Sequence, residues 1–292
     1  MRFILSRKGF DSSAGGMASP ILDDGTLLSL PIPSCDKTTF SDIQFRGKSY
    51  YDIICELDSK YNDIFDCCER CHVDPDLINN RKDSANNSWK PSFGQTGSAG
   101  SYLSNRDVKK DDIFLFFGWF KQTEMLDNWS LSFLDKTPDL HILFGYMQIG
   151  EILNEKEIIK NRFKFHPHAS NIHLNSNNNR LYIPPEKLKG LNIDAPGYGL
   201  FKMKDIKSPY DNEIVLTKEN KGRSTWRKEL IPIIGPSRIK PSKKEEKSSR
   251  KNTAEGKDSD GLQYSGQWQE IVFEESEEIT DWFINKLLPY SR

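Results

Sequence analysis

Residues 109–120, KKDDIFLFFGWF, decide the fold class of this chain of 292 residues. A charged turn leads directly into a continuous apolar segment, which predicts a buried β-strand at 113–120. A second apolar segment at 140–149, rich in β-branched and aromatic residues, predicts a neighbouring strand. Residues 121–139 between them are too many for a tight hairpin. Apolar spacing at 151–163 then predicts a helix.

Further elements are predicted on both sides of this centre. We expect strands within 1–33 and at 180–184, 213–217 and 267–274, helices at 50–61, 101–105 and 279–287, and a loop at 79–100. This mixture predicts an α+β fold. The sheet is expected to be mixed or partly closed, like a β-barrel, with helices packed on it.

Residues 238–260 differ in composition from the rest of the chain. Lys, Arg, Glu, Ser and Pro dominate there, and aromatic residues are missing. Such a segment cannot bury enough apolar surface to offset the entropy lost on ordering. We therefore predict a disordered loop at 238–260, inserted into a single domain made of 1–237 and 261–292.

Composition excludes several classes of protein. The formal net charge is −1, from 41 basic and 42 acidic residues, so the overall basic field of many nucleic-acid binders is absent. No apolar run approaches the roughly 18 residues that span a bilayer. The apolar residues at 3–5 precede basic ones, the reverse of a secretory signal. Three of the five cysteines crowd into 67–71, which argues against a disulfide framework and favours the cytoplasm.

Seven segments occur in order across nearly the whole chain, outside 238–260. They are MRFILSRKGFDSSAGG (1–16), SPILDDGTLLSLPIP (19–33), HVDPDL (72–77), FGQTG (93–97), DIFLFFGWF (112–120), HPH (166–168) and WQEIV (268–272). Together they resemble the nucleotide modification associated domain, third type. The resemblance implies a bacterial or phage system that modifies DNA bases or responds to modified DNA. It implies DNA or a nucleotide as partner, and partner proteins of a modification or defence operon.

A second likeness concerns the fold alone. The step from 111–112 into an apolar strand, followed by a returning strand, is similar to the core of PUA-like barrels, which include readers of modified bases. Such barrels usually carry glycine where this chain has Asp111.

The first strand ends in a cluster of charges. Arg7 and Lys8 are candidates to hold a phosphate, and Asp11 is a candidate for proton transfer. Gly9 between them would let the backbone approach a ligand closely. The plainer interpretation is an edge strand with its charges in water.

Residues 72–76 place His72, Asp74 and Asp76 close together. Such groups can hold a divalent cation, but Asp74 before Pro75 also suits the start of a helix, and we favour that interpretation. Cys68 and Cys71 form a single CxxC without a clear second pair, so a structural zinc is not expected. No motif fixes a metal or a cofactor.

The loop at 93–100 has glycines at spacing three, and backbone amides in such a loop can cradle a phosphate. The loop lacks the ending of a Walker motif, so an ordinary loop is the simpler interpretation. Gln95 is the candidate to read a base edge.

Three of the five histidines lie between 166 and 173. His166 and His168 alternate along the chain and are candidates for proton transfer, and Asn171 is a candidate for reading a polar edge. An exposed polar loop is the alternative. Glu270 is a further acid/base candidate, and Trp119, at the end of an apolar strand, is a candidate to stack on a base.

These observations lead to three hypotheses on function. The first is a nucleic-acid- or nucleotide-directed protein of a base-modification or phage-defence system, which binds one base or nucleotide in a pocket and can be catalytic. The second is a non-catalytic reader of modified DNA on a PUA-like scaffold. The third is a subunit of a defence complex that binds partner proteins.

Overall fold

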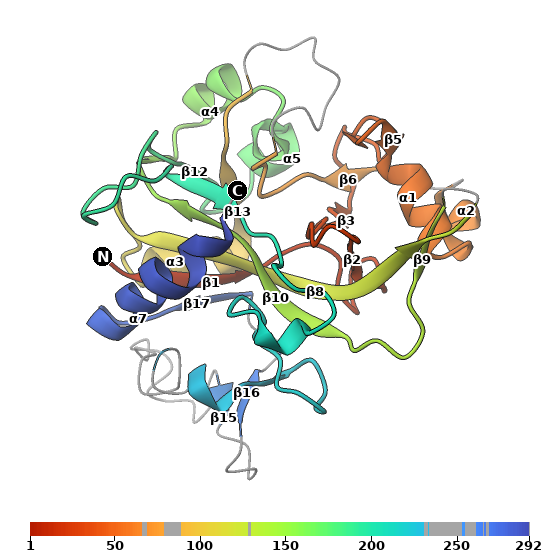
Figure 1. Cartoon of the computed structure of the whole chain (residues 1–292). Coiled ribbons are helices and arrows are strands. Elements are labelled where there is room, and N and C mark those ends of the chain that lie inside the picture. The colour runs from red at the N-terminus through yellow and green to blue at the C-terminus, as the bar shows by residue number, and fades with distance from the viewer. Residues whose placement is uncertain are drawn as a thin grey trace.

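The computed structural model describes residues 1–65, 69–78, 89–127, 130–230, 233, 253–254, 261–264, 266 and 269–291. Within these ranges, a seven-stranded mixed sheet crosses the molecule (Figure 1). Its strands, from one edge to the other, are β13 (Tyr198–Leu200), β10 (Leu140–Gln148), β8 (Ile113–Met125), β1 (Phe3–Arg7) and β17 (Glu270–Val272). Two more, β2 (Ser19–Ile21) and β9 (Leu131–Phe133), pair with the distal half of β8.

The position of β1 in this sheet places the first charged residues of the chain. β1 runs parallel to β8, with Arg7 opposite Phe117, and antiparallel to β17, with Ser6 opposite Glu270. The C-terminal end of β1 therefore brings Arg7 and Lys8 beside Glu270, although these residues are far apart in sequence.

Smaller sheets surround the central one. Their strands are β11 (Glu151–Leu153), β12 (Arg180–Ile183) and β7 (Phe93–Gln95) in one sheet; β14 (Thr225–Trp226), β16 (Leu262–Tyr264) and β15 (Thr253–Ala254) in another; β3 (Ile32–Pro33) with β6 (Cys71–His72); and β4 (Gln44–Phe45) with β5 (Lys48–Ser49).

Helices cover the periphery. They are α1 (Tyr50–Leu57), α2 (Lys60–Phe65), α3 (Gly97–Asn105), α4 (Lys156–Arg162), α5 (Asn171–Leu174) and α7 (Glu277–Trp282), and α7 continues into a π-helical turn at Phe283–Leu287. Ser49 and Ser276 cap α1 and α7, because their hydroxyls accept the backbone N–H of Asp52 and Ile279. None of the described helices combines the length and the apolar composition that crossing a bilayer requires.

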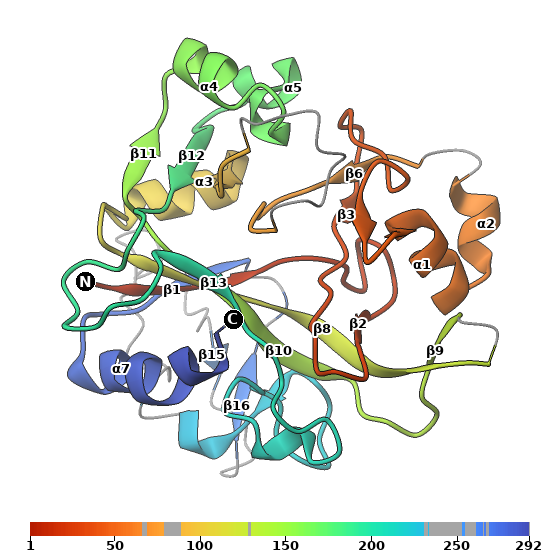
Figure 2. The ribbon, with the colours of Figure 1, turned by 45° about the horizontal axis from the view of Figure 1, so that its top comes forward.

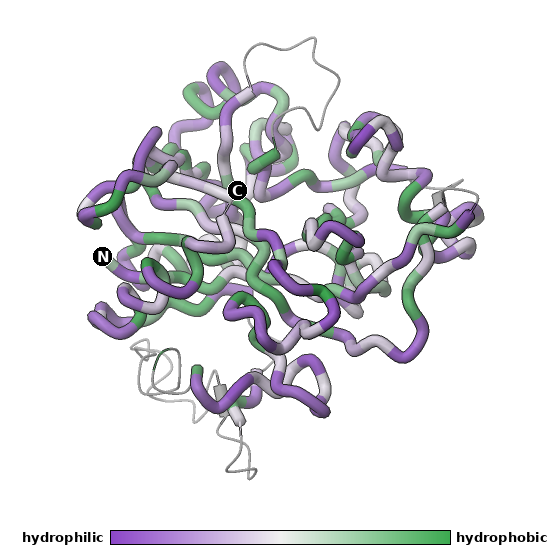
Figure 3. The backbone as a smooth tube through the Cα atoms, viewed as in Figure 1, coloured by the Kyte–Doolittle hydropathy of each residue, from purple (hydrophilic) through white to green (hydrophobic). Residues whose placement is uncertain are grey.

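The apolar interior forms three clusters. The largest follows β1, β8 and β10 and includes α7 and the π-helical turn after it, whose Phe283 packs against Phe3. The second lies under α1, and the third joins α4 and α5 to β11 and β12. Figure 2 shows these three parts as separate groups of elements, and Figure 3 shows the apolar residues concentrated along the central strands.

The α+β class and the two central strands are confirmed, since β8 and β10 occupy the predicted segments. The partly closed barrel is not confirmed. Among the described strands, β13 and β17 stand at opposite edges of an open sheet, and no pairing closes it.

Element predictions outside the site were wrong at three places. Residues 151–153 form strand β11 rather than the start of a helix, because they pair with β12. Residues 213–217 form no strand, and Val215 and Thr217 make only isolated bridges. Helix α3 begins at Gly97, inside the predicted loop at 79–100, and a side chain at Gly100 would collide with the carbonyl of Asn178 at 2.7 Å. Close packing therefore stabilises a helix in a glycine-rich sequence, although glycine has a low helix propensity.

Most of the predicted disordered loop at 238–260 lies outside the described residues. Thr253 and Ala254 are described and form β15, paired with β16. The disordered loop stays a prediction. The proposed single domain stays a prediction.

Candidate functional site

A cavity of about 610 Å³ lies at the C-terminal end of β1. Its wall is made by the β1 end and the loop that follows, the segments around β3 and β6, the start of α3, the segment 168–173, and the start of β17. All three apolar clusters include residues from these segments or from their immediate neighbours in sequence. Polar side chains can gather here because no single cluster closes over the space between them.

The loop after β1 is held by Asp11. One of its carboxylate oxygens accepts the backbone N–H groups of Ser13 (2.7 Å) and Ala14 (2.8 Å), and the other lies 3.3 Å from the guanidinium of Arg7. Burial alone would raise the pKa of Asp11, but these hydrogen bonds and the Arg7 charge lower it overall. Gly9 turns the chain with φ of +80°, where a side chain would also meet Ser29 Oγ at 2.7 Å.

Glu270 is the centre of a buried network on the neighbouring wall. Its Oε1 accepts from Lys8 Nζ at 2.8 Å, Gln95 Nε2 at 2.7 Å and Ser6 Oγ at 3.1 Å. The side chains of Lys8 and Glu270 are only 8% and 1% exposed. Within the described residues, Glu270 Oε2 is buried without a hydrogen-bond partner. Lys8 is therefore neutralised by Glu270, whereas Glu270 keeps one oxygen free.

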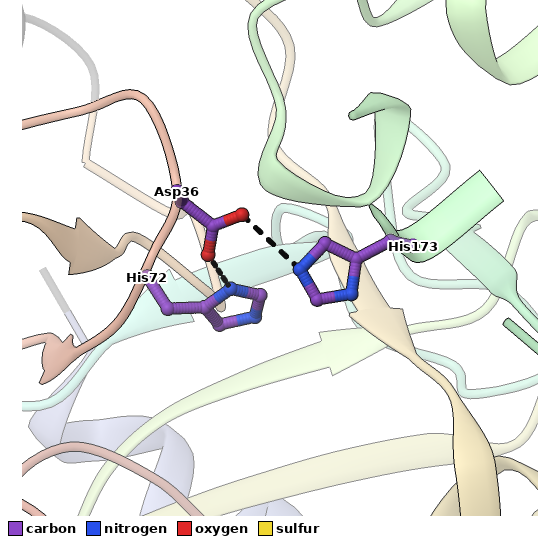
Figure 4. Close-up of side chains that lie close together, drawn as sticks. All are labelled: Asp36, His72 and His173. Atoms are coloured by element: carbon purple, nitrogen blue, oxygen red, sulfur yellow. Dashed lines mark hydrogen bonds and ion pairs between the residues drawn. The ribbon is translucent and has the colours of Figure 1, made fainter. Parts of the chain in front are cut away.

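Four of the five histidines gather on the opposite side, where His72, His168 and His173 line the cavity and His166 lies behind them. Asp36 lies between two of them, and accepts from His72 Nδ1 at 2.7 Å and His173 Nε2 at 3.1 Å (Figure 4). Asp74 lies beside the others, with Oδ1 at 3.3 Å from His166 Nε2 and Oδ2 at 3.9 Å from His168 Nε2.

These groups shift one another's pKa values. Burial alone would lower the pKa of His72, but the carboxylates of Asp36 and Asp74 raise it to about 9. Burial would raise the pKa of both aspartates, but their histidine partners hold it well below the usual range. Burial dominates at His168 and lowers its pKa to about 3, so this imidazole is neutral at neutral pH.

Local structure explains how His166 and His168 reach the same carboxylate. They flank Pro167 in a 3₁₀ turn at Pro167–Ala169, in which His166 Nδ1 accepts the backbone N–H of His168 at 3.2 Å. Alternating residues share a face only on an extended segment, and the chain turns here instead. Gly94 of β7 packs against the His168 ring, where an added side chain would meet Cδ2 at 2.2 Å.

The structure brings most of the predicted site residues together. Those that line the cavity are Arg7, Lys8, Asp11, Gln95, His168 and Glu270. His166 lies behind Asp74 and is buried. Asn171 is exposed at the start of α5 and does not line the cavity. Trp119 does not line it either: its indole N–H donates to Asp139, and Arg223 lies over its ring.

For other residues of the site, the sequence predicted a different role or no role. The helix predicted after Asp74 is absent: residues 73–78 form none, and Asp74 turns its carboxylate to the histidines. Cys68 of the single CxxC lies outside the described residues. Asp36 was missed, and no sequence signal could have found it, because its partners His72 and His173 stand 36 and 137 positions away.

A cavity of this size with converging polar groups is the kind of site that encloses a small ligand, rather than a surface that grips a long polymer. The chain belongs to the nucleotide modification associated domain 3 family, whose family model matches residues 2–274. The search of curated proteins and the search of solved structures found no match.

Proposed function

We propose that the protein binds one nucleotide, free or extruded from DNA, in this cavity, and acts on its base within a base-modification or phage-defence system. The observation that carries the proposal is the cavity itself, with a cation and a helix start on one side and buried acid/base groups on the other. Membership of the nucleotide modification associated family supports the choice of ligand.

Size and charge agree with a single nucleotide. Small-ligand sites commonly occupy about 300–1,000 Å³, and the cavity of about 610 Å³ falls within that range. Tight nonspecific binding of duplex DNA needs many phosphates to be neutralised, and a chain of net charge −1 offers little surplus for that.

The phosphate is assigned to Arg7 and the start of α3. Arg7 lines the cavity and is 20% exposed, while Lys8 is committed to Glu270. Thr96, the N-cap residue of α3, makes no side-chain cap to the helix, and Ser98 and Ala99 of the first turn line the cavity. Uncapped amides at a helix start, with an arginine nearby, favour a phosphate group.

The base is assigned to the interior. Gln95 stands there with its amide fixed between Glu270 and the backbone N–H of Thr96, so it can read a base edge only through this network. Tyr102 lines the same space, so we assign it the stacking role that was expected of Trp119, with Arg106 also lying over its ring.

Proton transfer is assigned to Glu270 rather than to the other candidates. Both oxygens of Asp11 are occupied by its own loop and by Arg7, and His166 lies behind Asp74. Glu270 lines the cavity and its Oε2 has no partner among the described residues, so we assign proton transfer to this oxygen. Such a buried carboxylate favours an enzyme over a reader, which needs no proton-transfer group.

Equilibrium binding of deoxynucleoside monophosphates tests this proposal. We expect Arg7→Gln to weaken binding about 10- to 100-fold, since a hydrogen bond to a charged group contributes about 1.5–3 kcal/mol. Arg46→Gln is the matched control, because Arg46 also pairs with a carboxylate but does not line the cavity. Mass spectrometry of the incubated nucleotides and DNA then reports any change in the base.

Four outcomes would count against the proposal in different ways. No binding of any nucleotide by the wild-type protein would contradict it, as would equal effects of the two arginine variants. Preferential binding of duplex DNA with modified bases, without chemical change, would support the reader instead. Binding of proteins alone would support the interaction subunit.

A further inference from the structure

We propose that His72, Asp74 and His168 bind a divalent transition-metal ion at the cavity wall, with Asp36 and Asn179 orienting the two imidazoles. This inference does not depend on the nucleotide, since the ion would bind whether or not a nucleotide is the ligand. It goes beyond the sequence, in which no motif fixes a metal.

The ligand atoms converge at suitable distances. His72 Nε2 and His168 Nε2 lie 3.7 and 3.9 Å from the same oxygen of Asp74, Oδ2, and the three ligand atoms are all within 4.8 Å of one another. Hydrogen bonds are shorter than this. Two ligands that are each about 2.0–2.2 Å from one ion stand up to about 4.4 Å apart, so small side-chain movements complete the site.

A hydrogen bond fixes the ring nitrogen that His168 offers. Its Nδ1 lies 2.6 Å from Asn179 Oδ1, and Asn179 Nδ2 donates to the backbone carbonyl of His168 at 3.1 Å. The second bond identifies which end of the Asn179 amide is the oxygen, so Nδ1 must carry the hydrogen. Nε2 therefore keeps its lone pair, and it is the atom that faces Asp74.

His72 is oriented in the same way. Its Nδ1 donates to Asp36 Oδ2 at 2.7 Å, which leaves Nε2 directed towards Asp74, where the metal ion would take the place of the proton that the two carboxylates hold on this imidazole at neutral pH. A carboxylate or carbonyl oxygen behind a metal-binding imidazole is the usual arrangement in metal sites, because it fixes the tautomer and the ring plane. Both imidazoles of this cluster have such an oxygen.

The kind and number of ligands indicate the class of ion. Two imidazoles and one carboxylate suit Fe²⁺, Co²⁺, Zn²⁺ or Ni²⁺, whereas Mg²⁺ and Ca²⁺ prefer oxygen ligands. Three protein ligands leave coordination positions open. His72, Asp74 and His168 all line the cavity, so the open positions face the space in which a ligand would sit.

A neighbouring group is the competing site. Asp36, His72 and His173 also bring three ligand atoms together. Their atoms, however, already stand at hydrogen-bond distances of 2.7 and 3.1 Å, so these residues hold one another without an ion. Variants of His168 and His173 therefore separate the two possibilities.

Metal titration of the full chain, stripped by chelator and without nucleotide, tests the proposal. We expect one Co²⁺ or Zn²⁺ per chain, measured by elemental analysis and by the visible absorption of Co²⁺. His168→Gln should weaken Co²⁺ binding at least tenfold, and Asn179→Ala about 10- to 100-fold. His173→Asn and the surface variant Asp24→Asn should bind as the wild type does.

A readout on the wild-type protein covers the case in which a variant does not fold. Electron spin echo modulation of the Cu²⁺-loaded protein should show two coordinated imidazoles. The proposal is overturned if the wild type binds no Co²⁺ or Zn²⁺ at about 100 µM metal, because a built metal site has a much higher affinity than that. It is also overturned if His173→Asn abolishes binding while His168→Gln does not.

Discussion

At the scale of single residues, the sequence predicted which residue types gather at the site better than how they are used. Lys8 and Glu270 were expected to serve separately, as phosphate holder and proton-transfer group, yet they form a buried ion pair of 2.8 Å. Their proximity follows from the pairing of β1 with β17, which joins the two ends of the chain. No local pattern contains that pairing, so no sequence signal could predict it.

This ion pair leads to a prediction on stability. Lys8→Met leaves the Glu270 carboxylate buried without its cation, and we expect a loss of about 3–5 kcal/mol in the free energy of unfolding. Lys8→Met combined with Glu270→Gln should recover much of that loss. Lys60→Met is the control, since its exposed pair with Asp58 should contribute only about 0–1 kcal/mol. Urea unfolding measures all three, and a cost below about 1 kcal/mol for Lys8→Met would contradict the buried pair.

At the scale of elements, hydrophobic pattern predicted the long central strands and failed for the short ones that build the cavity. β8 and β10 are continuous apolar runs, and such runs are buried strands wherever they pack. β7 and the start of α3 have no comparable signal. Both depend on glycines, because a glycine has no side chain and lets another group approach its backbone closely. The His168 ring approaches Gly94 in this way, and the Asn178 carbonyl approaches Gly100.

The close approach at Gly94 can be tested directly. Gly94→Ala would place a methyl group 2.2 Å from His168 Cδ2, so the ring or β7 must move. We expect a loss of about 1–3 kcal/mol in unfolding free energy, the usual cost of overpacking. Gly222→Ala is the matched control, because nothing lies within 4 Å of the added atom. Equal stability of the two variants would show that His168 is not held against β7.

At the scale of the whole molecule, the cavity lies where three apolar clusters border one another. The mixture of expected strands and helices predicted an α+β protein, and the structure agrees with that class; composition predicted only that a strong basic field is absent. The clusters come into contact through long-range packing. This packing brings Asp36 close to His173, although the two residues are 137 positions apart in sequence. Residue patterns predict elements, whereas the site is a product of how those elements are assembled.

The charged segment provides a prediction at this scale. Replacing 238–252 by a short Gly/Ser linker removes charged residues but keeps Thr253–Ala254, which pair with β16. Because the segment's composition offers little apolar surface to bury, we expect cooperative unfolding with a melting temperature within a few degrees of the wild type. Calorimetry measures it. A broad, non-cooperative transition would show that this segment is part of the folded domain.

The central claim is that one nucleotide occupies the cavity, and a crystal structure of the protein with a deoxynucleoside monophosphate tests it most directly. We expect the phosphate within hydrogen-bond distance of Arg7 and the first turn of α3, and the base inside, beside Gln95 and Glu270. A nucleotide bound elsewhere on the protein, or one with its phosphate turned towards Asp36 and Asp74, would contradict it.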